Sequence, residues 1–157
     1  MQMRLIALCL MAAGAAAGQT YSGPVPPKAD IPYLKHAENL VATEALDAKE
    51  EKSKKGDITY VIAGAASSAR TPLAAPIFLM RIDKLVASRL ALYKLEVRNG
   101  RREIAFAPKK PPKAIALDVT RLNDGKMARI EVQESLEPGE YSLSPEGSNQ
   151  VFCFQVF

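Results

Sequence analysis

The sequence predicts a mainly β protein, a single antiparallel β-sandwich of about seven or eight short strands, with a helix near the N-terminus as one alternative. Three observations carry this prediction. From Asp57 onward, apolar and polar residues alternate with a period of two. The apolar runs are short, and turn-forming residues separate them. The chain has 157 residues, 48% of them hydrophobic and 24% charged, a composition typical of one globular domain.

Each expected strand is an apolar run bounded by turn signals. In chain order, the runs are Ile58–Ile62, Ile77–Ile82, Tyr93–Val97, Ile104–Phe106, Ile115–Val119, Ala128–Val132, Tyr141–Leu143 and Val151–Phe157. Asn99-Gly100 is the strongest hairpin signal, because both residues tolerate a positive φ. Asn123-Asp124-Gly125 and the segment Glu146 to Asn149 are expected to form two further turns.

The first 18 residues have the composition of a secretory signal peptide. Arg4 lies in a short basic start, the stretch Leu5 to Ala13 is apolar, and Ala15 to Gly18 supplies small residues for cleavage. The segment 19–29 is rich in proline and is expected to be an extended, mobile tether. These boundaries leave residues 30–157 as the folded domain, with 20 basic and 17 acidic residues in the exported chain.

Residues 30–56 fit two structures. In the first, Asp30 caps a helix that ends near Gly56. The apolar residues at helical spacing are Leu34, Ala37, Leu40, Val41, Ala45 and Ala48. In the second, a β-hairpin has arms near 41–49 and 57–63 and turns through the lysine-rich stretch between them. Local propensity favours the helix.

The segment Leu136-Glu137-Pro138-Gly139-Glu140-Tyr141 resembles the tyrosine corner of Greek-key sandwiches, including immunoglobulin-like and fibronectin-III-like domains. The resemblance implies that Leu136 enters the core where one strand ends. Pro138 and Gly139 then turn the chain to the other sheet, and the Tyr141 hydroxyl bonds to backbone a few residues upstream. This resemblance concerns the fold and implies no activity.

The sequence offers little for catalysis. Cys9 belongs to the signal peptide, so Cys153 is the only cysteine of the exported chain. It is expected to be a buried hydrophobe in a strand, and the alternatives are a free reactive thiol or an intermolecular bridge. His36 is the only histidine, and no nucleophile motif surrounds Ser67 or Ser68. We therefore expect no enzyme activity, no metal and no cofactor.

Basic residues suggest a weak ligand-binding surface. Arg98, Arg101 and Arg102 flank the Asn-Gly turn, and a second group of Lys109, Lys110 and Lys113 lies in a proline-rich loop. Both groups could attract anionic polymers or lipid headgroups, or could simply be solvated turns that protect edge strands. Two loops, 64–76 and 108–113, are the places where a partner would dock.

These features predict an exported, periplasmic or secreted protein that binds rather than catalyses. The main hypothesis is a non-enzymatic binding or structural module of the cell envelope, with a partner protein or anionic polymer as its ligand. One alternative is a binder of anionic envelope polysaccharide or lipid, which would use the two basic groups. The other is a hydrolytic enzyme built on His36 or on paired acids.

Nucleic acid is not expected as a partner, because aromatics do not alternate with the basic residues. No transmembrane anchor is expected in the exported chain.

Overall fold

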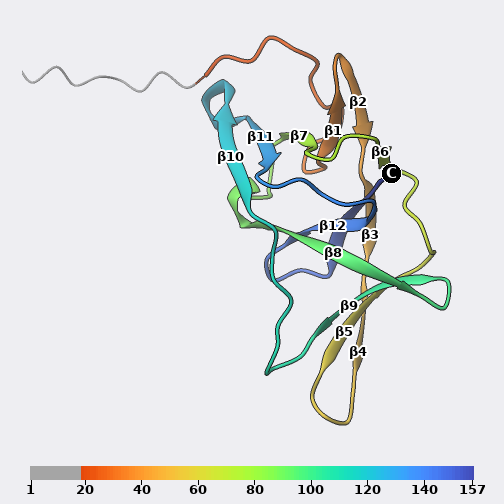
Figure 1. Ribbon diagram of the computed structural model, residues 1–157. Coiled ribbons are helices and arrows are strands. Elements are labelled where there is room, and N and C mark those ends of the chain that lie inside the picture. Colours follow the sequence, from red (N-terminus) through yellow and green to blue (C-terminus); the bar gives the residue numbers. More distant parts are fainter. Residues whose placement is uncertain (1–18) are drawn as a thin grey trace, which may run out of the picture.

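The computed structural model describes residues 19–157, so the predicted signal peptide lies outside the described residues (Figure 1). This part of the chain forms thirteen strands and two short 3-10 turns, with no α-helix. The first strands are β1 (Tyr33–His36), β2 (Asn39–Ala42), β3 (Glu44–Asp47), β4 (Lys49–Lys52), β5 (Ile58–Ile62), β6 (Arg70–Thr71) and β7 (Ile77–Arg81). They are followed by β8 (Leu90–Arg98), β9 (Arg101–Phe106), β10 (Leu117–Leu122), β11 (Met127–Val132), β12 (Gly139–Pro145) and β13 (Gln150–Val156).

The strands form two sheets. Sheet A has the order β10-β11-β7-β1-β2, and sheet B has the order β3-β13-β12-β8-β9-β5-β4, with β6 beside β13. All pairs between these strands are antiparallel except the short β6–β13 pair. The mainly β prediction is therefore confirmed, but the protein has more strands than predicted, and one sheet curls instead of lying flat as a layer of a sandwich.

Sheet B is a strongly curled half-barrel because its two end strands belong to one segment. β3 and β4 lie at opposite ends of the strand order, yet only Ala48 separates them in the chain. The Ala48 N–H donates to Asn149 next to β13, whereas the Ser53 N–H donates to Asp57 next to β5. Residues an odd number of positions apart point their N–H groups to opposite edges of a strand, so the segment 44–52 has a neighbour on each side.

Strands β12 and β13 are buried on both faces; β13 is apolar between its two glutamines, whereas β12 alternates apolar residues with Glu140, Ser142 and Ser144. On one face, Tyr141, Leu143, Phe152 and Phe154 pack against the inner face of sheet A. The opposite face points into the half-barrel, where Cys153 packs in a second apolar cluster with Ala48, Ile62, Leu95 and Val151. The sheet thus serves two cores, one between the sheets and one inside the half-barrel.

The helical interpretation of residues 30–56 is wrong. Asp30 and Ala37 have φ values of 58° and 52°, so the backbone turns at both residues instead of starting and continuing a helix. The Asp30 carboxylate accepts the backbone N–H groups of Asp83, Lys84 and Leu85, so it closes a loop and caps no helix. A hairpin with the predicted second arm is present, but its first arm is Lys49–Lys52 and not 41–49, since β2 pairs with β1 and β3 with β13. Burial of Leu34 in the core and pairing across strands outweigh local helix propensity.

The proline-rich segment 19–29 is extended, and it is bonded to sheet A. The Asn123 N–H donates to Gln19, the Tyr21 N–H donates to the Asn123 side chain, and Arg81 donates to the Pro27 carbonyl. Tyr21 packs beside Leu79 and its neighbours on this outer face of sheet A. This segment therefore covers apolar surface of the sheet.

The contacts expected for the segment Leu136–Tyr141 are present. Leu136 is buried in the core between the sheets, and the chain passes from β11 in sheet A to β12 in sheet B. The Tyr141 hydroxyl donates to the Glu137 carbonyl at 2.8 Å. The Asn99-Gly100 turn is also confirmed, with φ values of 50° and 73° between β8 and β9.

Candidate functional site

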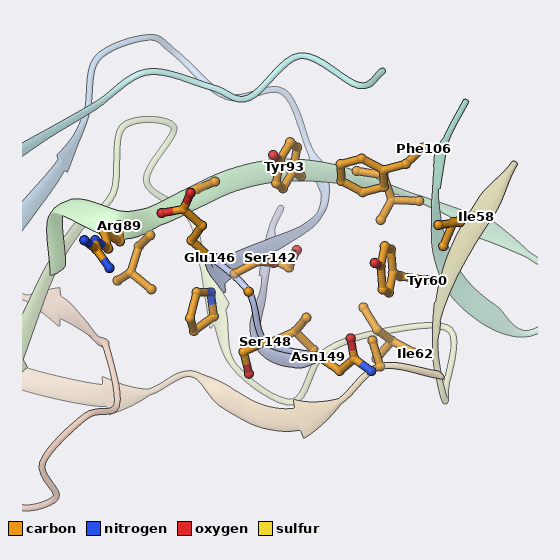
Figure 2. Close-up of a pocket in the computed structure, with 18 of the residues that line it drawn as sticks. Ile58, Tyr60, Ile62, Arg89, Tyr93, Phe106, Ser142, Glu146, Ser148 and Asn149 are labelled. Atoms are coloured by element: carbon orange, nitrogen blue, oxygen red, sulfur yellow. Dashed lines mark hydrogen bonds between the residues drawn. The ribbon is translucent and has the colours of Figure 1, made fainter. Parts of the chain in front are cut away.

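The concave face of the half-barrel contains a pocket of about 640 Å³ (Figure 2). Side chains pointing inward from β5, β8, β9, β12 and β13 surround it, together with the turn after β12. One part of the lining is apolar and consists of Ala48, Ile58, Tyr60, Ile62, Leu90, Ala91, Tyr93, Ile104, Phe106 and Val151. The other part contains Ser88, Arg89, Ser142, Ser144, Pro145, Glu146, Gly147, Ser148 and Asn149. The pocket is therefore amphipathic.

Three aromatic rings from three strands meet in the apolar part. Phe106 makes edge-to-face contacts with Tyr60 and with Tyr93, and both pairs of ring centroids are 5.5 Å apart. Edge-to-face geometry is favoured by the charge distribution of aromatic rings, so the three rings support one another. All three are only half-buried, although the strands on which they lie are paired on both sides. The cluster therefore offers apolar surface that no part of the described chain covers.

The polar part of the pocket lies along β12 and the turn that follows it. The hydroxyls of Ser142 and Ser144 are 3.2 Å apart and share a hydrogen bond. The Glu146 N–H donates to the Arg89 carbonyl, which fixes the turn beside the 3-10 turn Ala87–Arg89. The Arg89 and Glu146 side chains are exposed at this end (Figure 2), and neither has an ion-pair partner within residues 19–157. Hydroxyl groups and both signs of charge are therefore available to a ligand.

The interior of the half-barrel beyond the pocket holds a buried ion-pair network. Arg102 is only 1% exposed, and it pairs across strands with Ile62, so its side chain points inward. Its guanidinium donates to Glu44 at 2.8 Å and to the carbonyls of Ala63 and Gly64 at 2.7 and 3.0 Å. The Glu140 carboxylate lies 3.8 Å from the guanidinium. The network joins β3, β9 and β12 to the loop that follows β5.

The two carboxyls of this network have opposite pKa shifts. Burial acts to raise the pKa of Glu44, but hydrogen bonds from Ser68 and Arg102 outweigh it and hold that pKa below its ordinary value of 4.5. Burial raises the pKa of Glu140 above its ordinary value, even though the Ser67 N–H donates to it at 3.0 Å. One Glu140 oxygen and one Arg102 nitrogen are buried without a hydrogen-bond partner in the described chain. Glu140 is thus the costly member of the network and Glu44 the stabilising one.

These shifts predict opposite effects on acid stability. The stability that Glu44 contributes is present above pH 4.5 and is lost as the pH falls through its lowered folded pKa. Glu44→Gln should therefore lower stability at neutral pH and flatten the loss of stability on acidification. The folded protein gains stability when Glu140 takes up a proton, as the pH falls through the raised pKa of that carboxyl. Glu140→Gln removes this gain, so the loss of stability on acidification should become steeper.

Urea unfolding between neutral pH and about pH 3 measures both slopes. Glu38→Gln is the control for the loss of one carboxylate, because Glu38 is exposed in the turn between β1 and β2 and takes no part in the network. Equal acid profiles for Glu44→Gln and Glu140→Gln would contradict the assignment of the two carboxyls.

Cys153 lies in the apolar cluster inside the half-barrel and is completely buried. Burial raises the pKa of its thiol to about 12. The thiolate is the reactive form of cysteine, so this thiol is unreactive at neutral pH. The expectation of a buried hydrophobe in a strand is confirmed.

The six basic residues that the sequence suggested for ligand binding have different environments in the structure. Arg98 is paired with Glu96, and Arg101 is paired with Glu51 and Glu103. Arg102 is the buried member of the network and offers nothing to a surface ligand. Lys109, Lys110 and Lys113 are exposed in the loop after β9. The four structural residues Leu136, Pro138, Gly139 and Tyr141 form the corner between the sheets, away from the pocket lining.

Two other sequence candidates have structural partners. The His36 ring is hydrogen-bonded to the Thr71 hydroxyl at 2.9 Å. Ser67 donates to the Cys153 carbonyl, and Ser68 donates to Glu44, so the loop 64–76 closes the network end of the half-barrel. Within residues 19–157, no group of three or more His, Cys, Asp or Glu side chains is arranged to hold a metal ion. No helix in this range is both long and apolar enough to cross a membrane.

Comparison with known proteins gives no family for this chain. No protein-family model matches it, and neither a curated protein nor a solved structure does. The geometry of the half-barrel is therefore the basis for assigning a function.

Proposed function

We propose that this protein is an exported, non-enzymatic binding module of the cell envelope, and that the half-barrel pocket is its ligand site. The ligand we infer is a small amphipathic molecule. Its apolar part would lie on the aromatic cluster of Tyr60, Tyr93 and Phe106, and its polar part would face Ser144 and the turn after β12. The observation that carries this proposal is the aromatic cluster, which remains half-exposed inside a concave sheet.

The size and lining of the pocket support a small molecule. Small-molecule sites usually have volumes of about 300–1,000 Å³ and combine apolar walls with a few polar groups. The pocket of about 640 Å³ lies within that range and has both kinds of lining. Half-buried aromatic side chains also contribute strongly to binding, because they present a large apolar area and lose little conformational freedom.

The surroundings of the pocket favour binding over catalysis. The Ser142 and Ser144 hydroxyls bond to each other, and the lining contains no histidine or cysteine that could activate them. A hydrolytic enzyme built on His36 has no support from this site, because His36 is bonded to Thr71 beside the other sheet. Export to the periplasm or beyond rests on the signal-like composition of residues 1–18.

A relationship to immunoglobulin-like and fibronectin-III-like sandwiches is part of the proposal as well. It is supported by the Tyr141 hydroxyl bond to the Glu137 carbonyl and by the passage from one sheet to the other at that corner. In this interpretation, β9, β5 and β4, which complete the half-barrel, are an addition to a sandwich, and the addition creates the pocket.

A neutral fluorescent probe, N-phenyl-1-naphthylamine, tests the site without help from surface charge. We expect saturable binding with enhanced fluorescence, and we expect Tyr93→Ala to raise the dissociation constant about tenfold through the loss of aromatic contact area. The matched control is Phe157→Ala, which removes an exposed aromatic ring outside the pocket and should not change the affinity. Absence of saturable binding to the unaltered protein, or equal affinity after Tyr93→Ala, would refute the proposed site.

A further inference from the structure

Two lysine-rich segments that are far apart in the sequence leave the half-barrel at the same end. Ile58 in β5 lies opposite Phe106 in β9. The turn before Ile58 and the loop after Phe106 therefore both extend beyond this end of the sheet, where Figure 1 shows them at the lower end of the molecule. The lysines brought together in this way are Lys52, Lys54, Lys55, Lys109, Lys110 and Lys113. We call this group the lysine end.

The lysine end carries positive charge that the surrounding acids do not neutralise. All six lysines are exposed. Of these six, only Lys52 has an ion-pair partner within residues 19–157, and that partner is Glu50. Glu51 on the same strand is paired with Arg101. Asp57 is the remaining acid in the two segments, so cations outnumber anions at this end. Uncompensated charge of one sign attracts surfaces of the opposite sign.

The lysine end also adjoins apolar surface. Ile58 and Phe106, from which the two segments leave, both line the amphipathic pocket. Lys52 lies directly opposite Ile58, so it stands on the pocket-facing side of the sheet. The Pro111 and Pro112 residues hold the second segment away from regular strand pairing. Cationic groups therefore lie beside the apolar end of the pocket.

We propose that the lysine end docks on the surface of an anionic lipid bilayer, with its ammonium groups on the lipid phosphates. This inference goes beyond the pocket ligand and does not depend on the pocket being a binding site. The combination of cationic and apolar surface supports a lipid partner, because a lipid surface offers both phosphates and hydrocarbon. A hydrophilic polysaccharide would match the lysines alone. Lysines near an anionic membrane each strengthen binding through the surface potential.

Co-sedimentation of the purified protein with vesicles tests the proposal. Vesicles of phosphatidylglycerol and phosphatidylcholine should bind the protein at low salt, and phosphatidylcholine vesicles should not. Binding should weaken steeply as salt is raised, because exposed charges are screened. The combined change Lys109→Gln, Lys110→Gln and Lys113→Gln should lower the partition coefficient about a hundredfold. The same change at Lys52, Lys54 and Lys55 should have a similar effect.

A charge-matched control separates location from net charge. Lys28, Lys84 and Lys126 lie beside sheet A and are exposed, so changing all three to Gln removes equal charge from elsewhere and should leave most of the binding. An equal loss in this control, or no binding to anionic vesicles, would overturn the proposal. Equal or tighter binding to soluble polygalacturonate than to anionic vesicles would also overturn it. Tyr93→Ala should retain vesicle binding, so failure of the pocket proposal can be distinguished from failure of this one.

Discussion

Replacing Arg102 with methionine should destabilise the protein by about 3–5 kcal/mol, because it leaves carboxylates buried without their cation. Arg102 contributes the 2.8 Å ion pair to Glu44 and two hydrogen bonds to the carbonyls after β5. Methionine fills much of the same volume, so the loss reports on charge and hydrogen bonding more than on packing. Urea unfolding at neutral pH, followed by circular dichroism, measures it.

Two further variants test whether the loss of stability in Arg102→Met comes from the buried network. Arg101→Met removes the neighbouring arginine, whose pairs with Glu51 and Glu103 are at the surface, and should change stability little. Adding Glu140→Leu to Arg102→Met should recover part of the loss, because the second change removes a carboxylate that is only 4% exposed. If Arg102→Met were no more destabilising than Arg101→Met, the network would not hold the half-barrel together.

Phe154→Ala should cost about 3–5 kcal/mol and should loosen the contact between the two sheets. The Phe154 ring makes an edge-to-face contact with Phe78 of sheet A, with the ring centroids 5.0 Å apart. It is also stacked on the Tyr141 ring of the corner, with the centroids 5.6 Å apart. It is completely buried, so its removal leaves a cavity that its neighbours cannot fill without moving. Thermal and urea unfolding give the size of the loss.

Phe154→Leu is the graded control, since it keeps most of the apolar volume and should cost less than the alanine change. Phe157→Ala serves as a second control at an exposed ring. A loss for Phe154→Ala as small as that for Phe157→Ala would contradict a core shared by the two sheets at β13.

The parts of the fold that could be predicted are those fixed by local chemistry. Asn99 and Gly100 can both adopt positive φ, so the hairpin between β8 and β9 follows from two adjacent residues. The corner at Tyr141 likewise depends on a bond four residues back along the chain. Residues 33–52 could not be assigned in this way, because their partners are distant: β1 pairs with β7, and β3 pairs with β13.

The candidate pocket was hidden for a related reason. Tyr60, Tyr93 and Phe106 each occupy an ordinary inward position in an alternating strand; the pairing of β9 with β5 and β8 makes them neighbours, and the curling of sheet B turns them toward the pocket. That curling depends on the segment 44–52 having different neighbours along its length. Arg102 was grouped with exposed arginines because it adjoins a turn, but its position opposite Ile62 turns it inward. The alternation of β9 was the available signal, since Arg102, Ile104 and Phe106 share one face.

The central claim, that the half-barrel pocket binds an amphipathic small molecule, is tested most directly by mapping a bound probe with two-dimensional NMR. Amide shifts of the nitrogen-15-labelled protein would be followed during titration with N-phenyl-1-naphthylamine. We predict saturable shifts confined to β5, β9, the first half of β8, the second half of β12 and the segment 145–151, with sheet A unchanged. Shifts centred on sheet A, or shifts that grow linearly without saturating, would contradict the account.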